Sequence, residues 1–179
     1  MDKPWEIWLD LDGTLCGFCE AMCERLGMDI ARWPAGEYDL TKVFRQTERD
    51  LACQWDDAFF EGLMWAKGGV DLYRAARELV GPQNVHVASR LMRTGAAGKI
   101  AWVDKHLPLV VKEGNLHLSL RKAALAAPHR VLVDDNESEI IAWRDAGGPA
   151  ILVPRVWNAG FEDADAMGMV IETLKGTIR

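Results

Sequence analysis

Hydrophobic residues along the chain gather in short runs, and longer amphipathic stretches separate these runs. The apolar runs predict buried β-strands at residues 5–9, 85–88, 131–133 and 150–153, and a weaker run predicts a further strand at 115–118. The amphipathic stretches predict helices at about residues 70–80, 96–106 and 137–146. Strands that alternate with helices in this way form parallel sheets, so we expect an α/β fold in which helices flank a parallel sheet.

The segment from residue 18 to residue 67 does not follow this alternation. It is rich in Trp, Phe and charged residues, and we expect it to form helices with a loop around Pro34-Ala35-Gly36. Because it comes directly after the first strand, we interpret it as a small helical cap, inserted into a core formed by residues 1–17 and 68–179. The alternative is a helical excursion that only covers an edge of the sheet.

The length of 179 residues fits one core with a modest insertion. The net charge of −6 is spread along the chain, which argues against a polynucleotide partner because such binding needs clustered Lys and Arg. No stretch approaches the roughly 20 apolar residues of a membrane span, and the N-terminus lacks the pattern of a secretory signal. We therefore expect a cytoplasmic protein without a membrane partner.

Three of the four cysteines, Cys16, Cys19 and Cys23, would share one face of a helix. A metal site and packing against the core are the two interpretations. A structural zinc site usually takes two separated pairs of Cys or His ligands, and no second pair follows at a suitable spacing. We therefore favour packing, which is the usual role of a buried free cysteine.

Polar, reactive residues follow three of the expected strands at the point where each strand ends. These residues are Asp10 and Asp12 after the first strand, Ser89 and Arg90 after the second, and Asp134 and Asp135 after the strand at 131–133. Parallel sheets bind ligands at the carboxyl ends of their strands, so all three groups can converge on one edge.

The carboxylates in these groups indicate a metal ion. Asp10 and Asp12 flank a single residue, so in extended backbone their side chains point the same way. Close carboxylates repel, and a buried set needs a shared proton or a cation, for which Mg²⁺ is the usual choice in phosphate sites. Gly13 permits a tight turn around that ion. A solvated turn is the alternative for this segment alone, but its place directly after an apolar strand disfavours that interpretation.

Together these segments resemble the four motifs of the haloacid dehalogenase (HAD) superfamily of phosphatases. The matching residues are Asp10-x-Asp12-Gly13-Thr14, then Ser89, then a downstream lysine, and finally Asp134-Asp135, in the order of that superfamily. The resemblance implies a Rossmann-like core sheet, in agreement with the alternation of strands and helices.

A closer similarity is to the 5′(3′)-deoxyribonucleotidases. The first motif continues to Phe18 as in that family, and residues 99–107 are similar to its Lys/Tyr-x-Trp-Val-Glu-Lys helix. Pro154-Arg155-Val156-Trp157-Asn158 resembles the Pro-x-x-Asn segment after its last strand. The chain departs from the family pattern at Thr14, Gly17 and Arg90, which bears on the preferred nucleotide more than on the phosphatase chemistry.

The resemblance implies a mechanism with two displacements. Asp10 would attack phosphorus and form an aspartyl-phosphate, while Asp12 would protonate the leaving alkoxide and later take a proton from the attacking water. Mg²⁺ would be bound by Asp10, by Asp12 through its backbone carbonyl, and by Asp135, with Asp134 sharing or tuning the site. Ser89 would donate a hydrogen bond to a phosphoryl oxygen.

The lysine of the superfamily has two candidates in this chain. Lys122 lies twelve positions before Asp134 and follows the expected strand at 115–118, and we prefer it to Lys105, for which an exposed helix charge is the simpler interpretation. Arg90 and Arg121 could also reach phosphate, although most arginines are solvated at the surface.

Aromatic residues of the cap could hold a nucleobase, because bases stack on aromatic faces. Phe18 is the best-placed candidate through the resemblance, and Tyr38 and Trp65 are further candidates for substrate binding, with Trp55 and Phe60 as weaker ones. The alternative for each is a place in the hydrophobic core.

The leading hypothesis is an Mg²⁺-dependent phosphomonoesterase, a 5′(3′)-deoxyribonucleotidase that hydrolyses (deoxy)nucleoside monophosphates. The same site could instead act on a sugar phosphate or a polynucleotide end, and the acidic balance of the chain argues against the polynucleotide. The hypothesis of a non-catalytic binding module on this scaffold is disfavoured, because the chain has every acidic group that the chemistry needs. A monomer and a homodimer are both compatible with the sequence.

Overall fold

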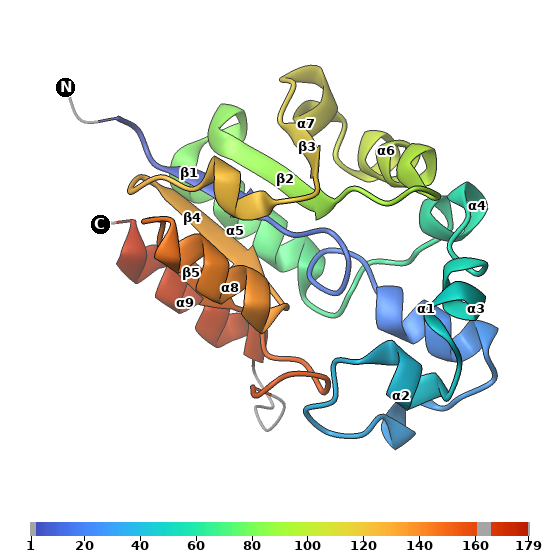
Figure 1. Cartoon of the computed structure of the whole chain (residues 1–179). Helices are drawn as coiled ribbons and strands as arrows, with labels where there is room; N and C mark the ends of the chain where they lie inside the picture. Colours follow the sequence, from blue (N-terminus) through green and yellow to red (C-terminus); the bar gives the residue numbers. More distant parts are fainter. Residues whose placement is uncertain (1–2, 161–165, 179) are drawn as a thin grey trace.

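The computed structural model describes residues 3–160 and 166–178 of the chain. Its centre is a parallel sheet of five strands in the order β3-β2-β1-β4-β5. The strands are β1 (Glu6–Leu9), β2 (Val85–Arg90), β3 (Leu116–Ser119), β4 (Arg130–Asp134) and β5 (Ala150–Leu152). The expected α/β fold with a parallel sheet flanked by helices is confirmed, and the weakest of the expected strands, β3, is an edge strand (Figure 1).

Side chains alternate between the two faces of the sheet, and both faces are buried. Ile7 and Leu9 belong to a large apolar cluster with side chains of α5 (Gly69–Val80), α6 (Ala96–His106), α7 (Pro108–Lys112) and α9 (Ala166–Thr177). Trp8 lies in a second cluster with Trp143 of α8 (Glu137–Asp145). Burial on both faces explains why the central strands have continuous apolar sequences instead of an alternating pattern.

The pairing of the strands aligns the ends that carry the polar residues. Leu9 pairs with Val87 on one side and with Val133 on the other. The residues that follow therefore leave the sheet at one edge, and the backbone N–H of Asp10 donates to the carbonyl oxygen of Val133 at 2.9 Å. This register is the reason that residues far apart in the sequence meet at the carboxyl edge.

Residues between β1 and α5 form short helices that lie beyond this edge of the sheet (Figure 1). The elements are α1 (Phe18–Arg25), η1 (Ile30–Arg32), α2 (Leu40–Phe44), α3 (Glu48–Ala52) and α4 (Asp57–Glu61). The chain leaves and returns along paired connections: the N–H of Gly17 donates to the carbonyl of Met64, and the N–H of Ala66 donates to that of Leu15, both at 2.9 Å. These paired connections support our proposal that residues 18–67 are a cap and residues 1–17 and 68–179 are the core.

The cap is also packed closely against the core helix α6. A Cβ atom added at Gly98 of α6 would lie 2.0 Å from the carbonyl oxygen of Asp57 in α4, so only glycine permits this approach of the two helices. The N–H of Gly98 donates to the Asp57 carboxylate at 2.9 Å. The position of α6 relative to the cap is therefore set by backbone contact.

The remaining sequence expectations concern cysteines and membranes. Cys19 and Cys23 pack with Trp33 and Trp157, and Cys16 lies in the main apolar cluster. All three cysteines are buried among these apolar side chains, and this burial supports the packing interpretation. None of the described helices has the length and apolar character needed to cross a membrane.

Candidate active site

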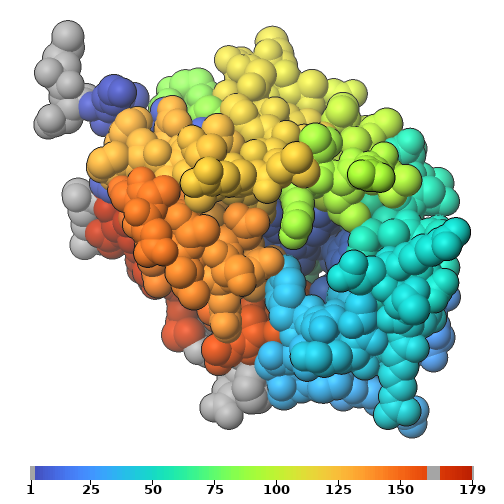
Figure 2. Space-filling model, in the orientation of Figure 1, coloured from blue at the N-terminus to red at the C-terminus, as the bar shows by residue number. Residues whose placement is uncertain are grey.

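A cavity of about 480 Å³ lies between the carboxyl edge of the sheet and the cap. The charged side chains of its wall come mainly from the core. Most of the apolar lining comes from the cap, including Phe18, Trp33, Leu40, Trp55 and the half-exposed ring of Tyr38, and the core adds Met92 and Trp157. The space-filling view shows the opening of this hollow between the cap, coloured blue to cyan, and the core (Figure 2). One cavity thus offers a charged end and an aromatic end.

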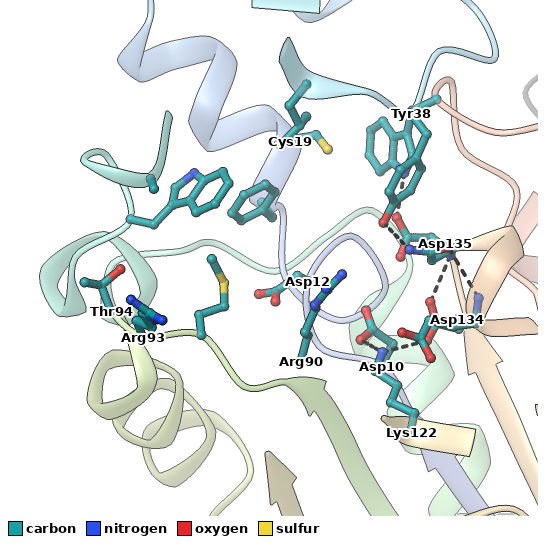
Figure 3. Close-up of a pocket in the computed structure, with 18 of the residues that line it drawn as sticks. Asp10, Asp12, Cys19, Tyr38, Arg90, Arg93, Thr94, Lys122, Asp134 and Asp135 are labelled. Carbon is teal, nitrogen blue, oxygen red and sulfur yellow. Dashed lines mark hydrogen bonds and ion pairs between the residues drawn. The ribbon is translucent and has the colours of Figure 1, made fainter. Parts of the chain in front are cut away.

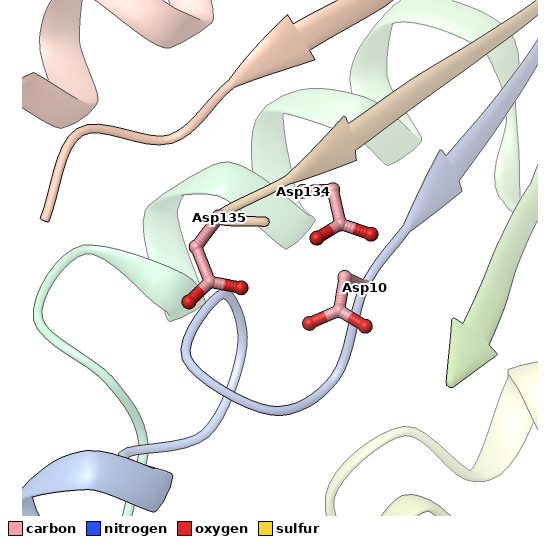
Figure 4. Close-up of side chains that lie close together, drawn as sticks. All are labelled: Asp10, Asp134 and Asp135. Carbon is pink, nitrogen blue, oxygen red and sulfur yellow. The ribbon is translucent and has the colours of Figure 1, made fainter. Parts of the chain in front are cut away.

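Three carboxylates meet at the charged end. One oxygen each of Asp10, Asp134 and Asp135 lies within 4.8 Å of the others, and all three residues are at most 4% exposed (Figure 4). Burial raises the pKa of Asp10 well above its usual value. The positive charge of Lys122 lowers this pKa in part, and the negative charge of Asp134 raises it further. Burial and then the charge of Asp134 raise the pKa of Asp135 to about 7. A hard cation would relieve this repulsion, and three carboxylates are a donor set that fits Mg²⁺.

Lys122 is the cation that the chain itself places in this group. It lies in η3 (Lys122–Leu125), is 4% exposed, and its Nζ donates to Asp10 Oδ1 and, at 2.7 Å, to Asp134 Oδ2. Burial alone would lower the pKa of Lys122, but the charges of Asp10 and Asp134 outweigh this effect and raise it. Lys105 is an exposed residue of α6, so the preference for Lys122 agrees with its position.

The side chain of Asp12 is held apart from the three carboxylates. Its Oδ2 accepts from Lys99 Nζ at 2.5 Å and from Ser89 Oγ at 3.2 Å. Lys99 also donates to Ser89 Oγ and to the carbonyl of Arg90, both at 3.0 Å. Ser89 is fully buried and does not line the cavity, but it contacts Asp12, which does.

Lys99 is a site residue that the sequence analysis did not single out, as are the cavity-lining residues Arg93 and Trp33. It is 1% exposed, and its ammonium lies 4.8 Å from the ring centre of Phe60. The spacing in the sequence indicates that Lys99 faces the core, because it precedes the apolar residues Trp102 and Val103 by three and four positions and so shares their helix face. Trp102 of the same face donates its indole N–H to the carbonyl of Leu63 at 2.7 Å, where the chain returns from the cap.

Two arginines line the cavity without a partner. Arg90 extends beside Asp10 and Asp12, and Arg93 lies next to Thr94 toward the aromatic end (Figure 3). Within residues 3–160 and 166–178, neither guanidinium makes a hydrogen bond or an ion pair. Arg121, the other arginine considered above, is exposed and lies outside this cavity.

The aromatic residues named from the sequence have different locations. Phe18 and Trp55 line the cavity with ring centres 5.9 Å apart, and Tyr38 lies above Asp135 (Figure 3). Trp65, expected at the substrate, does not line the cavity, and its ring packs at 4.9 Å against Trp102 instead. Phe60 is buried beneath Lys99. Partner choice among aromatic rings is a tertiary property, which spacing along the chain does not reveal.

The turn after β1 is adapted to close contact with Asp135. Gly13 has a φ angle of +85°, and a Cβ atom added there would lie 2.3 Å from Oδ2 of Asp135. Arg155 holds this turn from the other side, donating Nε to the carbonyl of Gly13 at 2.8 Å and a terminal nitrogen to that of Thr14 at 3.3 Å. Any other residue at position 13 would displace either the turn or the carboxylate.

A parallel sheet with acidic residues at two adjacent strand ends and a buried lysine between them is the arrangement that the resemblance to the HAD phosphatases implies. The model of the family described as "5′ nucleotidase, deoxy (pyrimidine), cytosolic type C protein" matches residues 4–168. The chain belongs to this family.

Structural comparison supports the same fold. A solved HAD family hydrolase from Deinococcus radiodurans R1, with bound phosphate and sodium, is 17% identical in sequence and superposes with a TM-score of 0.50. The similarity covers 94% of this chain and 89% of that chain. At this identity the likeness shows the fold alone. The chain matches none of the curated proteins.

Proposed function

We propose that this enzyme is an Mg²⁺-dependent nucleotidase that hydrolyses (deoxy)nucleoside monophosphates through an aspartyl-phosphate on Asp10. The observation that carries the proposal is the position of Asp10, which is buried at the charged end of the cavity beside Asp134, Asp135 and Lys122. Lys122 contacts Oδ1 of Asp10, while Oδ2 accepts no hydrogen bond from any residue that the structure describes. That second oxygen is therefore available to attack phosphorus.

Mg²⁺ would be held by Asp10, Asp134 and Asp135, together with the backbone carbonyl of Asp12, and would neutralise charge that develops on phosphate. Lys122 would keep Asp10 oriented during the attack. Asp12 would give its proton to the leaving alkoxide oxygen and later take one from the water that hydrolyses the aspartyl-phosphate. Lys99 and Ser89 hold Asp12 in place for both transfers.

Phosphate binding is assigned to the cationic side chains and the serine of the site. Arg90 extends into the cavity without an ion-pair partner among the described residues, so its guanidinium is available for a phosphoryl oxygen (Figure 3). Ser89 would donate to phosphate when its hydroxyl turns from Asp12, with Lys99 as donor to its oxygen.

The volume and the lining of the cavity support a nucleoside as the rest of the substrate. Ligand cavities of small molecules generally have volumes of about 300–1,000 Å³, and this one has about 480 Å³. Phe18 and Trp55 offer aromatic surface on which a base can stack, and Tyr38 lies near the metal carboxylates. The family description, a deoxy and pyrimidine 5′ nucleotidase, agrees with such a substrate.

The proposal is tested by hydrolysis assays with and without Mg²⁺. We expect EDTA-treated protein to be inactive on a small aryl phosphate and to recover when MgCl₂ is added, because three buried carboxylates repel phosphate without a cation. A panel of ribo- and deoxyribonucleoside 5′- and 3′-monophosphates and sugar phosphates then defines the substrate. Absence of turnover in Mg²⁺ would favour a binding module, and equal rates on sugar phosphates would count against a nucleotidase.

Phe18→Ala is expected to raise KM for nucleotides more than for a small aryl phosphate. Stacking of one base contributes about 1–3 kcal/mol, which corresponds to about 5- to 150-fold in KM. Steady-state kinetics on both substrates measure the difference. Tyr73→Ala is the control, because Tyr73 is a partly buried aromatic residue of α5 that packs against the main apolar cluster and does not line the cavity. An equal rise for both substrates would make Phe18 a packing residue.

A further inference from the structure

The segment after β5 contains Trp157, which contacts one of the three clustered carboxylates directly. Trp157 is 2% exposed, and its indole N–H donates to Oδ2 of Asp135 at 2.6 Å. The next residue, Asn158, donates its side-chain amide to the backbone carbonyls of Asp135 at 2.9 Å and of Val153 at 2.8 Å. The backbone and the side chain of Asp135 are therefore both held from this one segment.

The ring of Trp157 also contacts the cap. Trp33 of the cap packs on it with ring centres 5.6 Å apart. The backbone reinforces this contact, because the N–H of Gly36 donates to the carbonyl of Val156 at 2.8 Å. Close by, the side-chain amide of Asn136 donates to the hydroxyl of Tyr38 at 3.0 Å. The cap thus rests on the two short segments that carry and orient Asp135.

We propose that Trp157 is a positioning residue that fixes the carboxylate of Asp135 for metal binding, and that the cap keeps Trp157 in place through Trp33. This inference rests on the metal site of the proposed function. The Asp135 carboxylate is confined on two sides, by the indole N–H of Trp157 and by the turn at Gly13. A ligand that is already oriented loses little conformational freedom when the cation binds, and hydrogen bonds to metal ligands commonly change metal affinity by about 10- to 100-fold.

The test is the affinity for Mg²⁺ in the absence of substrate, measured by isothermal titration calorimetry. We expect Trp157→Phe to bind Mg²⁺ at least about tenfold more weakly than wild type, because the N–H that orients the Asp135 carboxylate is lost. Phenylalanine keeps most of the aromatic ring, so the packing of this segment should persist. Trp143→Phe is the matched control, because Trp143 is fully buried and donates its indole N–H to the carbonyl of Arg130 at 3.1 Å. The Mg²⁺ affinity of the Trp143→Phe variant should equal that of wild type.

Wild-type affinity in folded Trp157→Phe would overturn the positioning role. If this variant does not fold, replacement of Trp157 by benzothienylalanine, which keeps the shape of the ring and lacks the N–H, decides the question by the same measurement. If wild type itself does not bind Mg²⁺, the proposed function fails at its metal site, whereas a wild type that binds beside an unaffected variant contradicts only the role of Trp157.

A second substitution, Trp33→Ala, tests whether the cap keeps Trp157 in place. Trp33→Ala leaves the hydrogen bond of Trp157 available and removes the ring that packs on it. We expect Mg²⁺ affinity to fall several-fold, by less than in Trp157→Phe, since the indole gains freedom to turn away from Asp135. Unchanged affinity in Trp33→Ala would show that the cap does not contribute to the position of Trp157.

Discussion

Asp10→Asn is expected to abolish turnover while the protein stays folded. The neutral amide is a poor nucleophile, and loss of a nucleophile typically lowers kcat by about 10⁴-fold or more. The fold should persist because an amide oxygen can still accept the hydrogen bond from Lys122, and because the neutral group lies more easily beside Asp134 and Asp135. Hydrolysis of an aryl phosphate and circular dichroism measure the two effects.

Asp145→Asn is the control for this prediction. Asp145 is an exposed residue at the end of α8, so the same change of carboxylate to amide should leave both activity and stability unchanged. Near-wild-type activity in Asp10→Asn would exclude a covalent intermediate on this residue. Loss of activity together with loss of the circular dichroism signal would instead indicate that Asp10 is needed for folding.

Lys122→Met should affect stability as well as catalysis. The change leaves Asp10 and Asp134 buried without their ammonium partner, and breaking a buried ion pair in this way typically costs about 3–5 kcal/mol. Urea unfolding of the metal-free protein should show a loss of this size. Added Mg²⁺ should recover more stability in the variant than in wild type, because the cation replaces part of the missing positive charge. Activity should remain strongly reduced, since Asp10 is no longer held at Oδ1.

Lys105→Met is the matched comparison, because Lys105 is the other lysine that the sequence offers for this role and lies exposed on α6. Surface substitutions generally change the free energy of unfolding by no more than about 0.5 kcal/mol, and we expect wild-type activity. A larger loss of activity in Lys105→Met than in Lys122→Met would reverse the assignment of the phosphate lysine.

The contacts of Lys99 connect the helix at residues 96–106 with the chemistry. Its ammonium approaches Asp12 and Ser89 from the buried side of α6, while Trp102 anchors the same helix to the connection that leaves the cap. Under the proposed mechanism this helix therefore has two roles, which are to orient Asp12 through Lys99 and to attach the cap to the core through Trp102. Neither role can be inferred if the helix is treated only as an exposed element of the surface.

Local pattern was sufficient for much of the fold and for the acidic part of the site. The apolar runs before Asp10 and Asp134 are long enough to be buried strands, and parallel register then brings the residues after them to one edge. Lys122 could be ranked above Lys105 by its place after a strand. The prediction of the fold succeeded because it depends on alternation and on strand order, which are properties of short segments, while the roles of Lys122 and the aspartates stay predictions.

The sequence by itself thus determined the sheet, the set of aspartates at its carboxyl edge and the cap-sized insertion after β1. Only the tertiary structure decided that Lys99 points inward to Asp12, that Trp65 packs behind the cavity on Trp102, and that Trp157 contacts Asp135. The physical reason is the range of the interactions. Strand burial follows from neighbours along the chain, whereas the partner of a lysine or an indole is chosen by elements that meet only after the cap has packed on the core.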